Sequence, residues 1–384
     1  MYDTLIVGAG PAGAATAIGL AQAGHRVAIV ERERVPRPKP CGELVSPRAV
    51  AQFAALGVDA VALGHRVDHV RLTFDGPGSR RSTSTGWPDA STAAVVPREV
   101  LDTTLVERAT ALGAELLDGH TATEPLVNRG FVRGARVTRP DRSVADVVAT
   151  YTVVADGANS RFGRALGTFR QQEWPHAIAH RARYRSALHH AAEIELVVGL
   201  RDHGGTPVTG YAFMFPRGDG TVNVGVIAMS TSPSFRVLSL PRLLEAIVAE
   251  HGAAWHLDPD PVEVAAGGRL PLGASVGPVA GPTYLVVGDA AGVANPLSGA
   301  GLEYAIETGE LAADVLHEAL TEGSAAALQR YPRLLDDTYG TYFQVGRLTS
   351  RFLGNTTLST GAARLAATRR PAADAFVRIA ANQL

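Results

Sequence analysis

The chain has 384 residues, of which 46% are hydrophobic and 19% are charged, and its formal net charge is -1. A chain of this length can bury a large core and usually divides into two structural regions. Its near-neutral charge excludes a general attraction to nucleic acid or to anionic lipid. The single cysteine, Cys41, excludes an intrachain disulfide and a cysteine-based metal cluster. The chain carries no sign of an oxidising compartment, so we expect a soluble, cytoplasmic protein. No histidine stands at metal-ligand spacing from acids, so we expect no metal.

The first thirty-one residues predict a βαβ unit. A short apolar run over 5–7 ends in glycines, an alanine-rich helix is expected over 14–23, and a second β-branched run follows over 26–31. The uncharged stretch 4–24 is long enough to suggest a signal peptide or a membrane span. Its glycines and proline, and the lack of a basic segment before it, favour a strand, a turn and a helix instead.

The next elements continue this region and then change character. A helix over 97–112, a strand over 114–117 and a β-meander over 120–156 belong to the first region. Alternating runs between residues 176 and 230 predict a second, antiparallel sheet. The remaining elements are expected as strands over 194–198, 208–215 and 222–228, a helix over 240–251, a strand over 284–287, a helix over 302–320 and helices over 324–384.

A glycine-rich turn connects the first strand to the first helix. It reads Gly8-Ala9-Gly10-Pro11-Ala12-Gly13, the GxGxxG pattern of dinucleotide-binding units, and Glu31 ends the following strand. The first glycine allows a tight turn, the second lets backbone amides approach a pyrophosphate, and the third lets helix and strand pack closely. Glu31 is expected to accept hydrogen bonds from the adenosine ribose hydroxyls. Its negative charge would repel a 2′-phosphate, which disfavours NADP here, although the positive charge of the neighbouring Arg32 weakens this argument. The pattern does not distinguish FAD from NAD.

Two later segments narrow the choice of cofactor. One is Asp156-Gly157-Ala158-Asn159-Ser160-Arg161, and the other is Gly288-Asp289-Ala290-Ala291-Gly292, followed by Pro296 and Gly299-Ala300-Gly301. They resemble the DG and GD motifs of the FAD-binding fold shared with para-hydroxybenzoate hydroxylase. The resemblance implies FAD, with Asp289 on the ribityl chain, the turn at 299–302 under the isoalloxazine, and Arg98 near the pyrophosphate. A helix that begins at this turn would stabilise the negative charge of a reduced flavin.

Two further segments resemble the geranylgeranyl reductase family. They are Pro38-Lys39-Pro40-Cys41-Gly42-Glu43-Leu44-Val45-Ser46-Pro47-Arg48, and Gly210-Tyr211-Ala212-Phe213-Met214-Phe215-Pro216 with Gly220-Thr221-Val222-Asn223-Val224-Gly225. The resemblance implies an FAD-dependent oxidoreductase that reduces a C=C bond of an isoprenoid or another apolar metabolite. It also places Cys41 and Gly42 beside the flavin. The family's tryptophan is Phe213 here, so the substrate need not be a geranylgeranyl chain.

The residues in these segments have alternative interpretations. Tyr211, Phe213 and Phe215 share one strand face and, with Pro296, could line the substrate cavity, or they could be plain sheet core. Cys41 is the candidate catalytic residue, as a proton relay or a group that tunes the cofactor, but a lone cysteine is often a small buried side chain.

Three other functions stay open or are disfavoured. The main alternative is an FAD-dependent monooxygenase that hydroxylates or epoxidises an apolar or aromatic metabolite, and a flavin-holding protein without turnover is a third hypothesis. Halogenation is disfavoured because the halogenase WxWxIP segment is represented by Tyr211, Phe213 and Phe215. The catalytic lysine of the halogenases also has no counterpart, since the only lysine, Lys39, lies in another motif.

No second GxGxxG is present, so NAD(P)H or another electron donor, such as a separate protein, would bind transiently. The arginine-rich region 330–384 could touch a membrane, but a solvated helix face is favoured.

The overall prediction is an α/β protein with a Rossmann-like FAD-binding domain of the glutathione reductase type, a second domain with an antiparallel sheet, and a helical C-terminal region. The predicted boundaries are 1–70 with 97–170 and 270–325 for the FAD-binding domain, 71–96 with 171–269 for the substrate domain, and 326–384 for the C-terminal helices.

Overall fold

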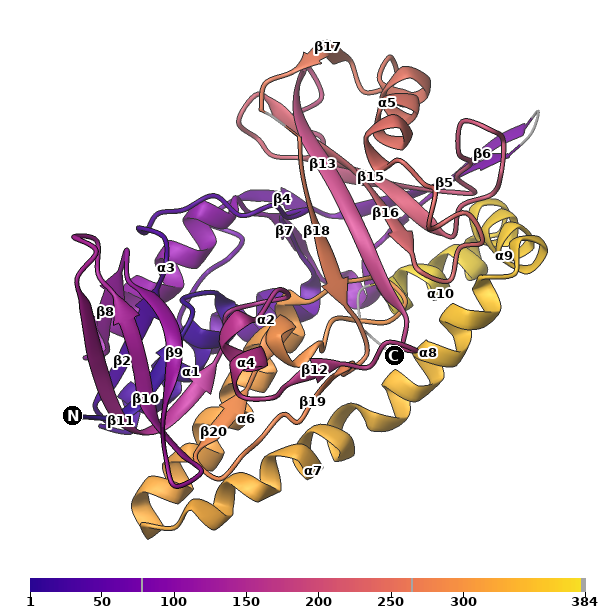
Figure 1. The fold of residues 1–384 in the computed structure, drawn as a ribbon. Helices are drawn as coiled ribbons and strands as arrows, with labels where there is room; N and C mark the ends of the chain where they lie inside the picture. Colours follow the sequence, from indigo (N-terminus) through magenta and orange to yellow (C-terminus); the bar gives the residue numbers. More distant parts are fainter. Residues whose placement is uncertain (77–78, 264, 381–384) are drawn as a thin grey trace.

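The computed structural model describes residues 1–76, 79–263 and 265–380. Two large sheets lie side by side, and the C-terminal helices run along one edge of the molecule from the first sheet to the second (Figure 1). This arrangement confirms the predicted α/β fold with a second, largely antiparallel sheet and a helical C-terminal region.

The first sheet has seven strands in the order β8-β2-β1-β11-β10-β9, with β20 paired to β11. Strands β1, β2, β8, β20 and the end of β11 run parallel, while β9, β10 and the beginning of β11 form an antiparallel meander. Parallel strands cluster their carboxyl ends at one edge, where open α/β sheets bind ligands. The bounds are β1 (Tyr2–Val7), β2 (Val27–Glu31), β8 (Glu115–Asp118), β9 (Thr121–Asn128), β10 (Phe131–Thr138), β11 (Val144–Val154) and β20 (Tyr284–Val286).

Helices α1 (Pro11–Gln22), α3 (Arg98–Ala111) and α6 (Leu302–Glu322) pack with this sheet, and α1 lies against both others. The approach of α6 to α1 is close because a Cβ atom at Gly309 would lie 2.5 Å from the carbonyl oxygen of Ala12. The alanine-rich composition of α1, ten of whose residues are buried, therefore serves tight helix packing.

The second sheet has eight strands in the order β17-β13-β16-β15-β14-β5-β6, with β18 paired to β13. Every pair is antiparallel except β14 with β5, because the β5–β6 hairpin comes from an earlier part of the chain and joins at the edge. The bounds are β5 (His69–Gly76), β6 (Ser79–Gly86), β13 (His176–Ser186), β14 (Glu193–Val198), β15 (Gly210–Pro216), β16 (Thr221–Met229), β17 (Leu257–Pro261) and β18 (Ala266–Pro271).

Side chains alternate between the two faces of this second sheet. Even-numbered residues of β13, β15 and β16 point to an outer apolar cluster that α5 (Leu240–His251) covers. Odd-numbered residues point to the inner face, which turns toward the first sheet and the C-terminal helices. The candidate substrate wall lies on this inner face.

Smaller elements connect the two sheets. A three-stranded sheet of β3 (Leu44–Val45), β7 (Ala93–Val95) and β4 (His65–Val67), and the pair β12 (Phe169–Arg170) with β19 (Val276–Gly277), were not predicted. The other elements are α2 (Pro47–Ala55), η1 (Pro88–Ala90), α4 (Arg161–Ala165), η2 (Gly288–Ala291), η3 (Ala325–Arg330), α7 (Tyr331–Leu335), η4 (Asp336–Gly340), α8 (Thr341–Leu353), α9 (Thr356–Thr368) and α10 (Arg370–Ala380).

The last helices pack against the second sheet. Helix α9 contacts β5 and β6, and the Thr83 hydroxyl donates a hydrogen bond to the carbonyl of Ala367 at 2.8 Å. Among the residues that the structure describes, every helix is too short or too polar to cross a lipid bilayer. The predicted domain boundaries remain a prediction.

Candidate active site

The glycine-rich turn at the start of α1 has two positions that only glycine can fill. Gly8 has φ +110°, and a Cβ atom there would lie 2.3 Å from the carbonyl oxygen of Ala155. A Cβ atom at Gly13 would lie 2.0 Å from the carbonyl oxygen of Gly8. Gly10 differs, because a Cβ atom would meet nothing closer than the guanidinium of Arg37 at 4.0 Å. The space in front of the α1 N-terminus is therefore open, as a phosphate site requires.

A chain of charged groups borders this open space. The Glu31 carboxylate accepts hydrogen bonds from the amides of Ala9 and Glu33, both at 3.0 Å, and pairs with Arg37 at 3.2 Å. Arg37 also pairs with Asp102 at 3.4 Å, and Arg98 binds the same carboxylate through two hydrogen bonds of 2.8 and 2.9 Å. This cluster brings the predicted Glu31 and Arg98 together.

Arg32 lies outside that cluster. Its guanidinium pairs with Glu33 at 3.0 Å, and both side chains are more than half exposed. Arg37, and not Arg32, is therefore the arginine that contacts Glu31. The sequence has arginines at 32, 34 and 37 and no local pattern that distinguishes them. Arg37 is distinguished by its ion pair with Asp102, which is distant in the sequence.

The second predicted turn also faces the start of α1. The Asp156 carboxylate accepts a hydrogen bond from the amide of Phe162 at 3.1 Å, while its Oδ1 atom is buried without a partner. Burial raises the pKa of Asp156. Gly157 has φ +79°, and a Cβ atom there would meet nothing within 4 Å, so it borders open space. An orphaned carboxylate oxygen beside open space suits a ligand with hydroxyl donors.

The third turn packs directly on the first. Gly288 has φ +59°, and a Cβ atom there would lie 2.8 Å from the Cβ of Ala12, so the two turns touch. A Cβ atom at Gly301 would lie 3.4 Å from Oδ1 of Asp289, which places this carboxylate at the N-terminus of α6. The three turns found in the sequence therefore converge at the carboxyl edge of the first sheet.

Asn295, which the sequence analysis did not single out, holds the turn before α6. Its Oδ1 atom accepts hydrogen bonds from the amides of Leu297 and Ser298 at 2.7 and 3.1 Å, and its Nδ2 donates to Tyr342 of α8 at 2.9 Å. Pro296 is buried beneath the same helix, since a Cβ atom at Gly346 would lie 2.4 Å from its Cγ. The turn with Gly299, Ala300 and Gly301 is thus fixed by α8.

The three converging turns, at 8–13, 156–157 and 288–301, form what we call the cradle. Cys41 and Gly42 connect this cradle to the aromatic residues of β15. A Cβ atom at Gly42 would lie 3.2 Å from the ring of Phe215, which stacks on Phe213 at a centroid distance of 4.5 Å. The thiol of Cys41 lies within electrostatic reach of Arg98 and of the Tyr211 hydroxyl. Tyr211 in turn donates a hydrogen bond of 2.6 Å to the carbonyl of Ser298.

Lys39 points back into the cradle. Its ammonium group lies within electrostatic reach of Arg98, Asp289 and Asp102, and burial, together with the charge of Arg98, lowers the pKa of Lys39. The segment from 39 to 42 therefore borders both the charged cluster and the aromatic face.

The register of the second sheet continues the aromatic face. Pairing places Tyr211 beside Ile227 and Ala179, Phe213 beside Gly225 and Arg181, and Phe215 beside Asn223 and Arg183. A Cβ atom at Gly225 would lie 2.3 Å from the Phe213 ring, so this glycine makes room for the ring. Apolar side chains occupy one end of the inner face, and arginines and an amide occupy the other.

Asn223 fixes the loop that carries Cys41. This fully buried side chain donates hydrogen bonds to the carbonyls of Cys41 and Gly42 at 2.9 and 3.1 Å. Glu43 follows with φ +69°, is buried, and pairs with Arg217 at 2.8 Å. Burial raises the pKa of Glu43 against the opposing charge of Arg217. The family-like segments of the sequence contain Asn223 and Glu43, but no pattern assigned either of them a role.

The chain matches the FAD binding domain family over residues 1–334. It is 35% identical over 349 residues to a menaquinone reductase of Mycolicibacterium smegmatis, covering 90% of this chain and 83% of the relative. It is 32% identical over 365 residues to a digeranylgeranylglycerophospholipid reductase of Methanopyrus kandleri, covering 92% and 90%. The chain belongs to the FAD binding domain family, in its geranylgeranyl reductase branch. It is an FAD-dependent oxidoreductase, as its sequence predicted.

Solved structures agree on the fold. A geranylgeranyl bacteriochlorophyll reductase-like protein of Thermoplasma acidophilum superposes with a TM-score of 0.83 at 22% identity, covering 96% of this chain and 92% of the other. The myxobacterial chondrochloren halogenase superposes with a TM-score of 0.68 at 21% identity, covering 100% and 90%. These likenesses show that one fold serves both kinds of flavoprotein.

Proposed function

We propose that this protein reduces a C=C bond of an isoprenoid or another apolar metabolite. The observation that carries the proposal is the junction between the cradle and the second sheet, where Gly42 contacts Phe215 and Tyr211 bonds to Ser298. A ligand ring placed between these groups would face the apolar inner side of the sheet. Relatives named as menaquinone and digeranylgeranylglycerophospholipid reductases support this reaction class.

The residues of the three turns fit FAD, and we assign its parts to them. Glu31 would hold the adenosine ribose, the amides behind Gly10 and the guanidinium of Arg98 would hold the pyrophosphate, and Asp289 would hold the ribityl chain. The open space at Gly10 and the unpartnered oxygen of Asp156 are the observations that support this fit. When bound, FAD supplies a carrier that delivers a hydride in a two-electron reduction.

The chain's own residues would orient the substrate and exclude water. Tyr211, Phe213 and Phe215 form the wall, and the Phe213 and Phe215 side chains are almost fully buried in a cluster with Ile227 and Met229. An apolar, dry wall lets an alkene lie without competing water. Asn223 and Ser298 hold the loops on either side of the substrate position through the hydrogen bonds described above.

Reduction of a C=C bond adds one hydride and one proton. Cys41 is the candidate catalytic residue, because its Sγ is a protic group on the loop between the cradle and the wall. It would hold the proton that the second alkene carbon receives. We further propose that NAD(P)H or a separate protein supplies the electrons transiently.

Anaerobic turnover tests the reaction class. Protein loaded with FAD is reduced and mixed with a polyprenyl quinone as the probe, and the products are analysed by mass spectrometry. After the quinone ring has been reoxidised, we expect a gain of two hydrogen atoms in the polyprenyl chain and no gain of oxygen, and a much lower rate in the Cys41→Ala variant. A product that gains an oxygen atom only when O2 is present would instead assign the protein to the monooxygenases.

A further inference from the structure

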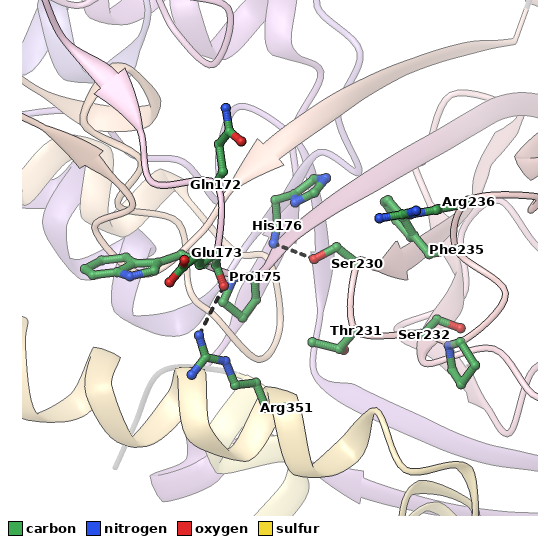
Figure 2. Close-up of a pocket in the computed structure, with 12 residues that line it drawn as sticks. Gln172, Glu173, Pro175, His176, Ser230, Thr231, Ser232, Phe235, Arg236 and Arg351 are labelled. Atoms are coloured by element: carbon green, nitrogen blue, oxygen red, sulfur yellow. Dashed lines mark hydrogen bonds between the residues drawn. The ribbon is translucent and has the colours of Figure 1, made fainter.

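One cavity of the molecule lies outside the cradle and the aromatic wall. It has a volume of about 420 Å³ and lies where residues 172–176 lead into β13, residues 230–236 follow β16, and Arg351 projects from α8 (Figure 2). None of its lining residues belongs to the FAD-binding turns. Its size lies within the range of pockets for small organic ligands.

Arginines outnumber acids around this cavity. Arg236 and Arg351 line it, Arg347 stacks on the lining residue Trp174 at 4.0 Å, and two more act electrostatically on His176. They are Arg170, Arg236, Arg269, Arg347 and Arg351, and within the described ranges none of them forms an ion pair with an acid. The only acid in the lining is the exposed Glu173.

This charge lies at the surface, because Arg236, Arg269 and Arg351 are exposed, and it differs from the charge of the buried arginines, which have acidic partners. Arg98 and Arg37 of the cradle pair with Asp102, and Arg217 of the inner sheet face pairs with Glu43. Around the cavity, burial and the charge of Arg351 lower the pKa of Arg347, against the opposing charge of Asp336. An anionic ligand would add negative charge among these arginines.

Buried polar atoms in the lining also lack partners. The Nδ1 atom of His176 and the hydroxyl of Thr231 are buried without a hydrogen bond. The backbone around them is held, since the His176 amide donates to the Ser230 hydroxyl at 3.0 Å (Figure 2). Buried polar atoms of this kind usually have a protein, water or ligand partner. Phosphate oxygens can accept from a hydroxyl, an imidazole N–H and two guanidinium groups.

We propose that this cavity binds the phosphate group of an organic phosphate, with Arg236, Arg351 and Thr231 on the phosphate and the rings of Trp174 and Phe235 against its organic part. The site does not depend on the reaction proposed above. Two sources share this chemistry: a pyridine nucleotide that donates electrons, and an amphiphile with a phosphate head.

The position of the cavity suits either source. Ala177 and Met229 directly follow and precede its lining residues, and they begin the apolar inner face along which a hydrocarbon tail could lie. On the other side, the Arg347 guanidinium donates to the carbonyl of Gly273, where a Cβ atom would lie 3.4 Å from Pro296. One arginine side chain therefore separates the cavity from the turn before α6.

Calorimetric titration of the FAD-loaded protein tests the site with three probes: inorganic pyrophosphate, NADPH and dodecyl phosphate. We expect saturable pyrophosphate binding that weakens as salt rises. The double variant R236Q/R351Q should bind at least about tenfold more weakly, since hydrogen bonds to charged groups are the strong ones. The matched control is Arg185→Gln, an exposed arginine at the other end of β13.

The organic probes identify the source. Tighter binding of NADPH than of pyrophosphate, lost in the double variant, assigns the cavity to the electron donor, and the same result with dodecyl phosphate assigns it to an amphiphile. If the double variant loses its FAD or its fold, the Thr231→Val variant, which keeps both arginines, replaces it. We then expect Thr231→Val to bind pyrophosphate severalfold more weakly than the wild type. The proposal is overturned if pyrophosphate does not bind the wild type, or if it binds these variants as tightly. Arginine-dependent binding without alkene reduction would reject the proposed reaction and keep this site.

Discussion

Two glycines of the same turn should respond to alanine in opposite ways. Gly10 has φ -78°, which any residue adopts, and a Cβ atom there meets nothing closer than 4.0 Å. We therefore expect Gly10→Ala to change the free energy of unfolding of the apoprotein by less than about 1 kcal/mol, because the smaller entropy of the unfolded chain offsets the cost of alanine at the N-cap of α1. The methyl group would nevertheless stand where the pyrophosphate approaches. Loss of one charge-assisted hydrogen bond, about 1.5–3 kcal/mol, weakens FAD binding by at least about tenfold.

Gly13→Ala is the matched contrast. Its Cβ would lie 2.0 Å from the Gly8 carbonyl oxygen, so strand and helix must separate, and we expect destabilisation of about 1–3 kcal/mol, as for overpacked cores. Urea unfolding of both apoproteins and fluorescence titration with FAD separate the two effects. If Gly10→Ala binds FAD as tightly as the wild type, the pyrophosphate does not lie at this turn and the placement of the cofactor is wrong.

Three further predictions concern single side chains. Arg37→Gln should weaken FAD binding because Glu31 and Asp102 lose their shared partner. Arg32→Gln, at an exposed side chain, should leave FAD affinity unchanged, and equal FAD affinities of the two variants would refute the role of Arg37. Asn223→Ala should lower kcat by about tenfold while FAD affinity is kept, because it releases the carbonyls of Cys41 and Gly42; an unchanged kcat would show that this loop needs no anchor. Burial and the charges of Arg170 and Arg269 lower the pKa of His176, so the unfolded chain takes up this proton first and stability should fall as the pH drops below about 6.5. The free energy of unfolding, measured with urea at several pH values between 5 and 7, should change less with pH in His176→Asn than in the wild type. An identical pH dependence would show that His176 does not cause the loss of stability.

The sequence contained the local parts of the cradle. The turns at 8–13, 156–157 and 288–301 could be found because each requires glycine at a fixed place between a strand and a helix. Their convergence followed from the order of parallel strands, whose carboxyl ends share one edge.

The residues that the sequence analysis missed act across long separations. Asn223 bonds to carbonyls 182 and 181 residues earlier in the chain, and Asn295 bonds to Tyr342 on a helix 47 residues later. The choice of Arg37 over Arg32 depends on Asp102 in another element. Such contacts leave no periodicity in the chain, and the abundance of arginine hides the few that face a ligand.

A crystal structure of the FAD-loaded protein would show directly whether the three turns hold one FAD. We predict adenosine density at Glu31, pyrophosphate density in front of α1, and the isoalloxazine between Cys41 and the turn at 298–301, facing Tyr211 and Phe213. Flavin density whose ring points away from the second sheet, or none at these three turns, would contradict this prediction.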